Sequence, residues 1–290
     1  MLLALWSLSR PRMLPFVLLL PLLGAGWAHW EHRLDLVGLP RLGAVLGAWA
    51  LLHAGTLWWN AALDRDGADV LFGRAAPVPA AAAPMGVGAL VLAVGLAALA
   101  GPLAGAAAVG AALLSLLYSH PATAWKGHPL AGPLVNAAGY GLLSPLAGWA
   151  TVQVPASPLT LAVWPLLAVG LLAPTFAAQA FQGPEDAARG YRTLVVTHGP
   201  ATCLRAARAS LLLALAWGCG LAALGAVPRL CLLGAPAWLL TVRWLSGRAR
   251  DAAQGPSLAQ GLVLRMVAAT ALTVLLAWLD LVWLAPARAR

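Results

Sequence analysis

Long apolar segments separated by short polar loops run through the whole chain. Nine of these segments are typical of membrane-crossing helices, because the hydrocarbon core takes roughly 20 apolar residues to span. They lie near residues 13–30, 42–63, 85–101, 103–119, 132–152, 158–182, 203–225, 229–246 and 262–285. Only Gly101-Pro102 separates the third from the fourth, so eight spans are also allowed. We expect an all-α membrane protein, a bundle of about nine transmembrane helices in a single domain over residues 1–290.

The composition supports this assignment. Hydrophobic residues make up 61% of the 290-residue chain and charged residues 9%, whereas soluble domains carry about 25% charged residues. In a soluble protein the net charge of +9 would suggest a nucleic-acid partner. Here the basic residues lie in short loops between apolar segments, which is their usual topogenic position. We therefore expect the lipid bilayer as a partner and no nucleic acid.

The basic residues also predict the orientation. Most of them lie in loops on the side of the bundle that holds the N-terminus, and basic loops stay in the cytoplasm. We expect the N-terminus and the polar loops on the cytoplasmic side of the cell (inner) membrane. Several Trp residues near predicted span ends are typical of an aromatic belt at the lipid headgroups. They are Trp6, Trp27, Trp30, Trp58, Trp59 and Trp149.

Acidic residues gather in two of the predicted cytoplasmic loops. The first loop follows the second span and contains Asn60, Asp64, Arg65, Asp66 and Asp69, with Arg74 beyond. Asn60 and Asp64 are four residues apart, which places them on one face of a helix. The second loop contains Gln182, Glu185, Asp186, Arg189 and Arg192. There, Gln182 and Asp186 repeat the spacing of four.

Two such helix ends facing each other predict a magnesium and phosphate site. Mg²⁺ prefers oxygen ligands and is usually bound by one or two carboxylates together with substrate phosphates. Basic side chains nearby can hold the phosphate oxygens. They are Arg65, Arg74, Lys126, Arg189 and Arg192. The alternative is that these loops only solvate the membrane surface; the concentration of acids, with Asn or Gln at helical spacing, favours the site.

A third polar loop lies on the same side of the bundle. It reads Tyr118-Ser119-His120-Pro121 and continues to Lys126, the only lysine of the chain, with Asn136 beyond. His120 and His128 are eight residues apart in a segment broken by proline. We interpret them as neutral interface histidines in preference to a metal pair.

Together the three loops resemble those of the UbiA superfamily of intramembrane prenyltransferases. That family carries Asn-Asp-x-x-Asp-x-x-x-Asp after its second helix, which Asn60 and Asp64 match. Its Tyr-Ser-x-Pro loop leading to Lys is similar to Tyr118 through Lys126. Its second acidic motif precedes a Gly-x-Arg-Thr element, as Asp186 precedes Gly190-Tyr191-Arg192-Thr193. A nine-helix architecture is also what the resemblance implies.

The resemblance implies a function and a role for each polar residue. The function is Mg²⁺-dependent transfer of an isoprenyl group from a prenyl diphosphate to a lipophilic or aromatic acceptor in the membrane. The implied metal ligands are Asn60, Asp64, Asp69, Gln182 and Asp186. The implied catalytic residues are Tyr118, Lys126, Arg65 and Arg192, and the implied substrate-binding residues are Asp66, Arg74, Asn136, Glu185 and Arg189.

The chain departs from the family pattern at three places. Ala61 replaces the second residue of the first motif, Asp69 falls one residue late, and Gln182 replaces the first acid of the second motif. Fewer carboxylates should weaken Mg²⁺ binding. Terpene cyclisation on the same fold and an inactive relative that binds isoprenoid lipids therefore remain alternatives. A transporter is disfavoured, because transporters place polar residues mid-span and here these residues lie at one end.

Overall fold

The computed structural model describes the chain except residues 33–36, 65–70, 73–76, 249–255, 281 and 283–290. The residues it describes form helices joined by loops, with no strand among them. The chain divides into two units. Unit 1 consists of Met1–His29 and Leu34–Val154, and unit 2 of Trp30–Arg33 and Pro155–Arg290. The expectation of one domain stays a prediction.

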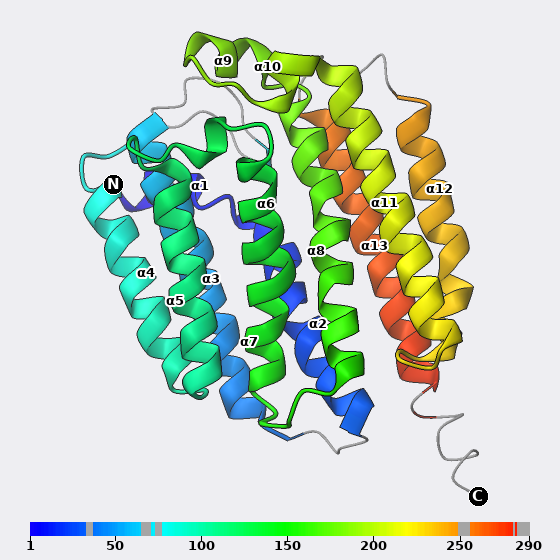
Figure 1. Cartoon of the computed structure of the whole chain (residues 1–290). Helices are drawn as coiled ribbons and strands as arrows, with labels where there is room; N and C mark the ends of the chain where they lie inside the picture. The colour runs from blue at the N-terminus through cyan, green and yellow to red at the C-terminus, as the bar shows by residue number, and fades with distance from the viewer. Residues whose placement is uncertain (33–36, 65–70, 73–76, 249–255, 281, 283–290) are drawn as a thin grey trace, which may run out of the picture. The chain divides into compact units, whose positions relative to one another are not determined.

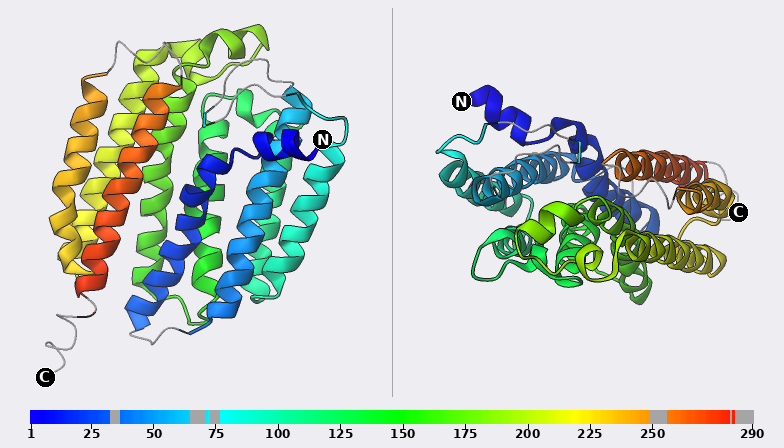
Figure 2. Two further views of the ribbon diagram at one scale, coloured as in Figure 1. Left: turned by 180° about the vertical axis from the view of Figure 1, so that it is seen from behind. Right: turned by 90° about the horizontal axis from the view of Figure 1, so that it is seen from above.

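Unit 1 contains the helices up to α7 (Figure 1). They are α1 (Leu2–Leu8), η1 (Pro11–Met13), α2 (Leu14–His32, whose last residues belong to unit 2), α3 (Leu39–Asp64), α4 (Ala82–Ala98), α5 (Pro102–Ser119), η2 (Trp125–Gly127), α6 (Ala131–Ala138), η3 (Gly139–Leu143) and α7 (Ser144–Ala150). Helices α3, α4 and α5 run side by side, as Figure 2 also shows. The segment from α6 through α7 is continuous, with a π turn at η3.

Close helix contact in unit 1 depends on small residues. A Cβ atom at Gly24 would collide with the Pro145 carbonyl oxygen, and one at Gly148 with the Pro21 carbonyl oxygen. Helices α2 and α7 therefore touch backbone to backbone, which is how small residues let membrane helices pack. The core beside this contact is rich in alanine. Within it, the Trp49 indole donates a 2.5 Å hydrogen bond to Ser144.

The tryptophans of unit 1 do not all behave as predicted. Trp6 is 62% exposed, as the aromatic belt requires. Trp149, in contrast, is only 1% exposed and packs against Trp27, with ring centroids 5.0 Å apart. Its assignment to the belt was wrong, because the α2–α7 contact covers it. Trp58 donates to the Leu5 carbonyl at 2.7 Å and fixes α1 against α3.

Unit 2 contains the remaining helices. They are α8 (Pro158–Gln179), α9 (Gly183–Ala188), α10 (Leu194–His198), α11 (Pro200–Ala223), η4 (Arg229–Gly234), α12 (Ala235–Ser246) and α13 (Ser257–Leu279). Helices α8, α11, α12 and α13 form a closed ring in which each contacts the next. At the start of α8, Glu31 accepts hydrogen bonds from Ser157 and from Thr160, the latter at 2.7 Å. This carboxylate extends the capping box that begins the helix.

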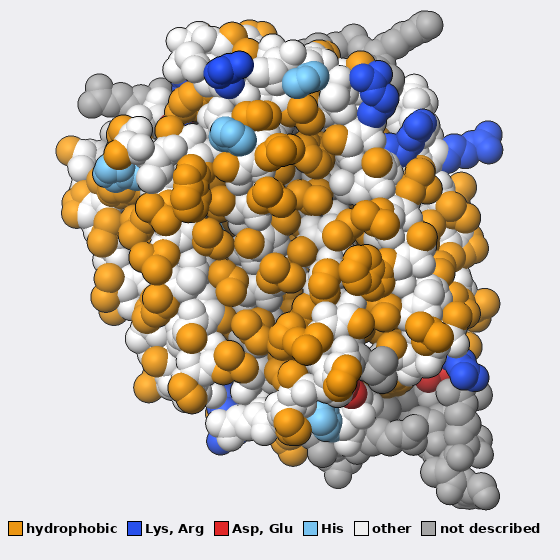
Figure 3. All heavy atoms as spheres, in the orientation of Figure 1, with side chains coloured by type: hydrophobic (Ala, Val, Ile, Leu, Met, Phe, Trp, Pro, Cys, Tyr) orange, Lys and Arg blue, Asp and Glu red, His pale blue; other side chains and the backbone are white. Residues whose placement is uncertain are grey.

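The described parts of the predicted spans are helical, although residues 132–152 contain α6, η3 and α7, and residues 229–246 contain η4 and α12. Among the described residues, six helices are long and apolar enough to cross a membrane: Pro11–His32, Leu39–Asp64, Pro102–Ser119, Thr160–Gln179, Pro200–Ala223 and Ser257–Leu279. Helix α4 is apolar but has only 17 residues, and its separation from α5 at Gly101 is confirmed by the positive φ of 135° there. The count of nine spans stays a prediction. On the face shown in Figure 3, hydrophobic side chains cover the lengths of the helices, and Lys and Arg lie toward their ends.

Candidate functional site

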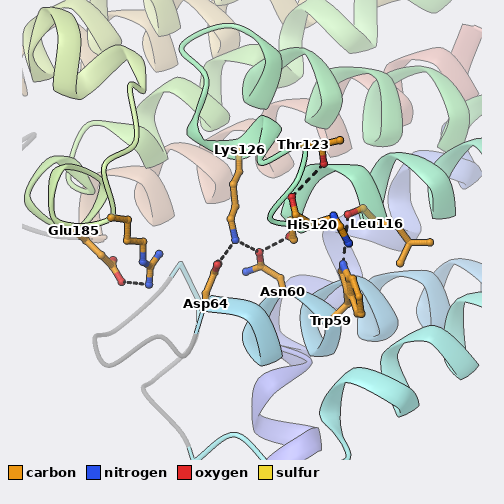
Figure 4. A network of polar contacts seen from close by, with 10 residues as sticks. Trp59, Asn60, Asp64, Leu116, His120, Thr123, Lys126 and Glu185 are labelled. Carbon is orange, nitrogen blue, oxygen red and sulfur yellow. Dashed lines mark hydrogen bonds and ion pairs between the residues drawn. The ribbon is translucent and has the colours of Figure 1, made fainter.

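The polar network of unit 1 gathers where α3 and α5 end on the same side of the unit. Asn60 and Asp64 occupy the last two turns of α3, and Ser119 is the last residue of α5. The loop after α5 turns back through Ala124, in the left-handed region with φ 41°, into the short helix η2. Lys126 lies on η2, and its side chain reaches down to α3 (Figure 4).

Lys126 bridges the Asn-x-x-x-Asp pair. Its ammonium donates to Asn60 Oδ1 at 3.3 Å and forms an ion pair with Asp64 Oδ1. The Lys126 and Asp64 side chains are each 8% exposed. A buried charge is tolerated when it is paired and hydrogen-bonded. Asn60 and Asp64 lie on one face of α3, as their spacing of four predicted. Their side-chain oxygens therefore contact the same ammonium group.

Ser119 is a site residue that sequence reasoning did not assign. Its hydroxyl donates to Asn60 Oδ1 at 2.6 Å, and Ser119 is only 3% exposed. Asn60 Oδ1 therefore accepts from both Ser119 and Lys126, which fixes the orientation of the amide. The signal was available in the Tyr-Ser-x-Pro loop, but the partner of the serine depends on how α5 packs against α3.

The other predicted residues of this loop lie close by. The Asn136 amide donates to the Tyr118 hydroxyl at 3.4 Å and to the Gly132 carbonyl at 3.2 Å. Gly132 lets α6 begin against the loop, since a Cβ there would lie 3.2 Å from the Lys126 carbonyl oxygen. The structure thus brings Tyr118, Asn136 and Lys126 to one end of unit 1.

The histidines of this loop have local structural roles. The His128 Nδ1 atom accepts from the backbone of Leu130 and Ala131 at 3.2 and 3.1 Å, at the start of α6. The His120 ring stacks on Trp59, with centroids 6.5 Å apart and planes at 16°. These contacts give both histidines a structural role, and their interpretation as neutral interface histidines stays a prediction.

In unit 2 the second acidic motif folds around Asp186. This residue lies in α9 and is 8% exposed. Its Oδ2 atom accepts a 2.7 Å hydrogen bond from Thr193, and its carbonyl accepts the Tyr191 backbone N–H at 2.9 Å. Gly190, with φ 73°, permits the turn that brings Thr193 back to Asp186. The Gly-x-Arg-Thr spacing therefore serves to hold the carboxylate.

The remaining predicted residues of unit 2 surround this turn. Glu185 and Arg189 form a 2.8 Å ion pair, with side chains 33% and 24% exposed, and Arg192 is exposed. Gln182 precedes the first residue of α9, and its backbone carbonyl accepts the Asp186 N–H at 2.9 Å. Helix α8 ends at Gln179, three residues before the predicted end of the span.

Gln179 is a second residue that sequence reasoning did not assign. It is 6% exposed, and its Oε1 atom is buried without a hydrogen-bond partner among the described residues. A buried unpaired amide oxygen is costly. Its signal in the sequence was its place three residues before Gln182, at the end of an apolar span.

Only some of the residues predicted for the magnesium and phosphate site lie within the described part of the chain. Arg65, Asp66, Asp69 and Arg74 lie outside the described residues. Among those that are described, no group of three or more His, Cys, Asp and Glu residues could hold a metal ion. The pair Asn60 and Asp64 nevertheless fits a cation, because a lysine ammonium already contacts both oxygens. Both are hard oxygen ligands of the kind that Mg²⁺ prefers.

The helices and this polar end define an integral membrane protein of the all-α class. The model of the UbiA prenyltransferase family matches residues 18–268. The chain therefore belongs to the UbiA prenyltransferase family. No curated protein matches the chain at a significant level.

Solved structures of similar fold support the assignment. A UbiA homologue from Archaeoglobus fulgidus bound to Cd²⁺ is 16% identical, with a TM-score of 0.69 over 96% of this chain and 99% of that one. The same homologue bound to GPP and Mg²⁺ gives 15% identity and a TM-score of 0.64, over 94% and 99%. A digeranylgeranylglyceryl phosphate synthase is 14% identical, with a TM-score of 0.65 over 97% of this chain and 98% of that one. At these identities the likeness shows the fold.

Proposed function

We propose that the protein transfers an isoprenyl group from a prenyl diphosphate to a lipophilic or aromatic acceptor within the membrane, with Mg²⁺ as cofactor. The observation that carries this proposal is the buried network of Lys126 with Asn60 and Asp64, at the polar end of a UbiA-family chain. The A. fulgidus homologue has been solved with GPP and Mg²⁺ and with DMAPP and Mg²⁺, which supports the proposal.

Lys126 has the central role in the proposed chemistry. A bound Mg²⁺ would neutralise part of the diphosphate charge, which favours departure of the leaving group. The Lys126 ammonium would donate to the diphosphate oxygens, where negative charge increases as the allylic carbon–oxygen bond breaks. The ammonium now contacts Asn60 and Asp64, and we propose that it moves off those two oxygens when it donates to diphosphate.

Asn60 and Asp64 are therefore proposed to exchange one cation for another. Without donor, Lys126 satisfies both oxygens. With donor, Lys126 turns to the diphosphate, and the two oxygens become available to Mg²⁺. Free Mg²⁺ would have to displace the ammonium while no diphosphate is present to accept its hydrogen bonds. The metal should therefore bind well only together with diphosphate. Ser119 keeps Asn60 Oδ1 directed into the network in both states.

The second motif enters the proposal through the family resemblance. Asp186, held by Thr193, is assigned to metal binding together with Gln182 and Asp69. Exposed Arg192 and the Glu185–Arg189 pair are assigned to the donor. Tyr118 and Asn136, joined by their hydrogen bond, are assigned to orienting the diphosphate. Arg65, Asp66 and Arg74 keep the assignments made from the sequence. The cytoplasmic orientation and the cell (inner) membrane also remain proposals.

The test is donor binding by the detergent-purified protein. Calorimetry with geranylgeranyl diphosphate should show binding that requires Mg²⁺ and that is lost in Asp64→Asn and in Asp186→Asn. Thr197→Val, which removes an exposed hydroxyl near the second motif, serves as a control and should bind as the wild type does. Equal binding with EDTA, or by both Asn variants, would contradict the assigned site. An absence of binding to shorter and longer donors would favour the inactive relative.

A further inference from the structure

A cluster of aromatic and basic side chains lies at the end of α12 and the start of α13 in unit 2, two helices that carry no residue assigned to transfer. Trp244 lies in the last turn of α12, Arg248 follows that helix, and Gly261 and Arg265 lie on α13. Helix α12 ends and α13 begins on the side of unit 2 that carries α9 and α10 (Figure 1). We call these four residues the Trp244 cluster.

The cluster is built around one indole. A Cβ at Gly261 would lie 2.9 Å from Cη2 of Trp244, so only glycine lets the ring pack this closely on α13. Arg265 is one turn beyond Gly261, on the same helix face. Its guanidinium carbon lies 4.6 Å from the ring centroid of Trp244, and that of Arg248 lies 5.6 Å from it. Both distances are within the range of cation–π attraction.

The positive charge of the cluster is concentrated and exposed. Arg243, Arg248 and Arg265 are all exposed. In the part of the chain that the structure describes, no carboxylate forms an ion pair with Arg243 or Arg265. Cation–π contact orients a guanidinium but does not neutralise it. The exposed guanidinium of Arg265, oriented by the indole, therefore remains able to attract an anion.

The surroundings of the cluster are those of the lipid boundary. Arg265 follows Ser257 by eight residues, which places it about 12 Å along the helix axis. Helix α13 is an apolar candidate span. Leu264 beside Arg265 is 61% exposed, and Leu240 on α12 is 64% exposed. An arginine on such a surface extends its guanidinium to the headgroups, where lipid phosphates lie.

We propose that the Trp244 cluster binds the phosphate of an anionic glycerophospholipid. Arg265, oriented by the indole, donates to the phosphate oxygens with the planar geometry that suits guanidinium. The acyl chains lie along the exposed leucines of α12 and α13. These exposed leucines favour a lipid over a free diphosphate, because a diphosphate has no acyl chain to pack against them.

The test is native mass spectrometry of the full-length protein released from detergent with added lipid. The wild type should retain phosphatidylglycerol in preference to phosphatidylcholine. Arg265→Gln should lower retention of phosphatidylglycerol about fivefold, as expected for one basic residue at a membrane surface. Arg265→Lys should also lower retention, because lysine keeps the charge but lacks the planar fork.

The matched control is Arg229→Gln, which removes an exposed arginine from η4, at the other end of unit 2. It should retain phosphatidylglycerol as the wild type does. Equal loss in Arg229→Gln and Arg265→Gln would overturn the proposal in favour of unspecific surface charge. Equal retention of the two lipids by the wild type would overturn it as well. Displacement of phosphatidylglycerol by millimolar inorganic diphosphate would instead assign the cluster to soluble phosphates.

Discussion

Replacing Lys126 with methionine should change metal binding and donor binding in opposite directions. The substitution keeps the length of the side chain but removes the ammonium that contacts Asn60 Oδ1 and Asp64 Oδ1. Free metal would then no longer compete with a resident cation for these oxygens. A hydrogen bond to a charged group contributes about 1.5–3 kcal/mol. Removing that competition should tighten binding of free Mn²⁺ roughly 10- to 100-fold.

The assay is electron paramagnetic resonance of Mn²⁺, titrated into the purified protein without any diphosphate. In parallel, calorimetry with Mg²⁺ present should show weaker binding of geranyl diphosphate to Lys126→Met, because the ammonium no longer reaches the leaving group. Removing one partner of a buried pair is destabilising by about 3–5 kcal/mol, so the melting temperature of the variant is measured first. Arg229→Met serves as a control for loss of one positive charge.

Two results would refute the reasoning. If Lys126→Met and the wild type bind free Mn²⁺ equally, the ammonium does not occupy the metal ligands. If metal and donor binding both fall together in a folded variant, Lys126 only maintains the structure of the loop.

The remaining predictions concern single contacts. Ser119→Ala removes one donor to Asn60 Oδ1 and should weaken donor binding roughly fivefold, for a loss of about 1 kcal/mol; unchanged affinity in calorimetry would refute the positioning role. Thr193→Val removes the hydroxyl that holds Asp186 and should lower Mg²⁺-dependent donor binding; Thr197→Val, with wild-type binding, is its control. Gly148→Ala introduces a Cβ that overlaps the Pro21 carbonyl, so its melting temperature should fall by several degrees, since overpacking costs typically 1–3 kcal/mol. Gly26→Ala, on α2 with open space around its Cβ, should melt no lower than the wild type.

Much of the fold could be predicted from the apolar pattern alone. Long apolar segments can satisfy their backbone in a membrane only as helices, so the described parts of the predicted spans are helical. The break at Gly101 followed from local chemistry, because a proline begins the next helix. The burial of Trp149 could not be predicted, because it depends on the backbone contact between α2 and α7. Such tertiary contacts leave no periodic signal in a helix that is apolar on all sides.

The candidate site was predicted in part, for the same reason. The spacing of Asn60 and Asp64 is local to one helix, so their shared face followed from the sequence. Both residues contact Lys126, which lies 62 residues beyond Asp64. This contact depends on how the loop after α5 returns to α3. Ser119 and Gln179 were not assigned, because a serine or glutamine has no signal until its partner, or its lack of one, is seen. Asp186 was selected from its spacing and from the family motif, and its bond to Thr193 gives that motif a physical reason.

The measurement that tests the proposed function most directly is prenyl transfer in native membranes. Membranes containing the overproduced protein are incubated with labelled prenyl diphosphates of several chain lengths, and the lipid extract is analysed by chromatography and mass spectrometry. The account predicts a labelled apolar product that requires Mg²⁺, disappears with EDTA and is absent from membranes containing Asp64→Asn at equal abundance. A product that forms equally with Asp64→Asn, or no labelled product with any donor despite folded protein, would contradict it.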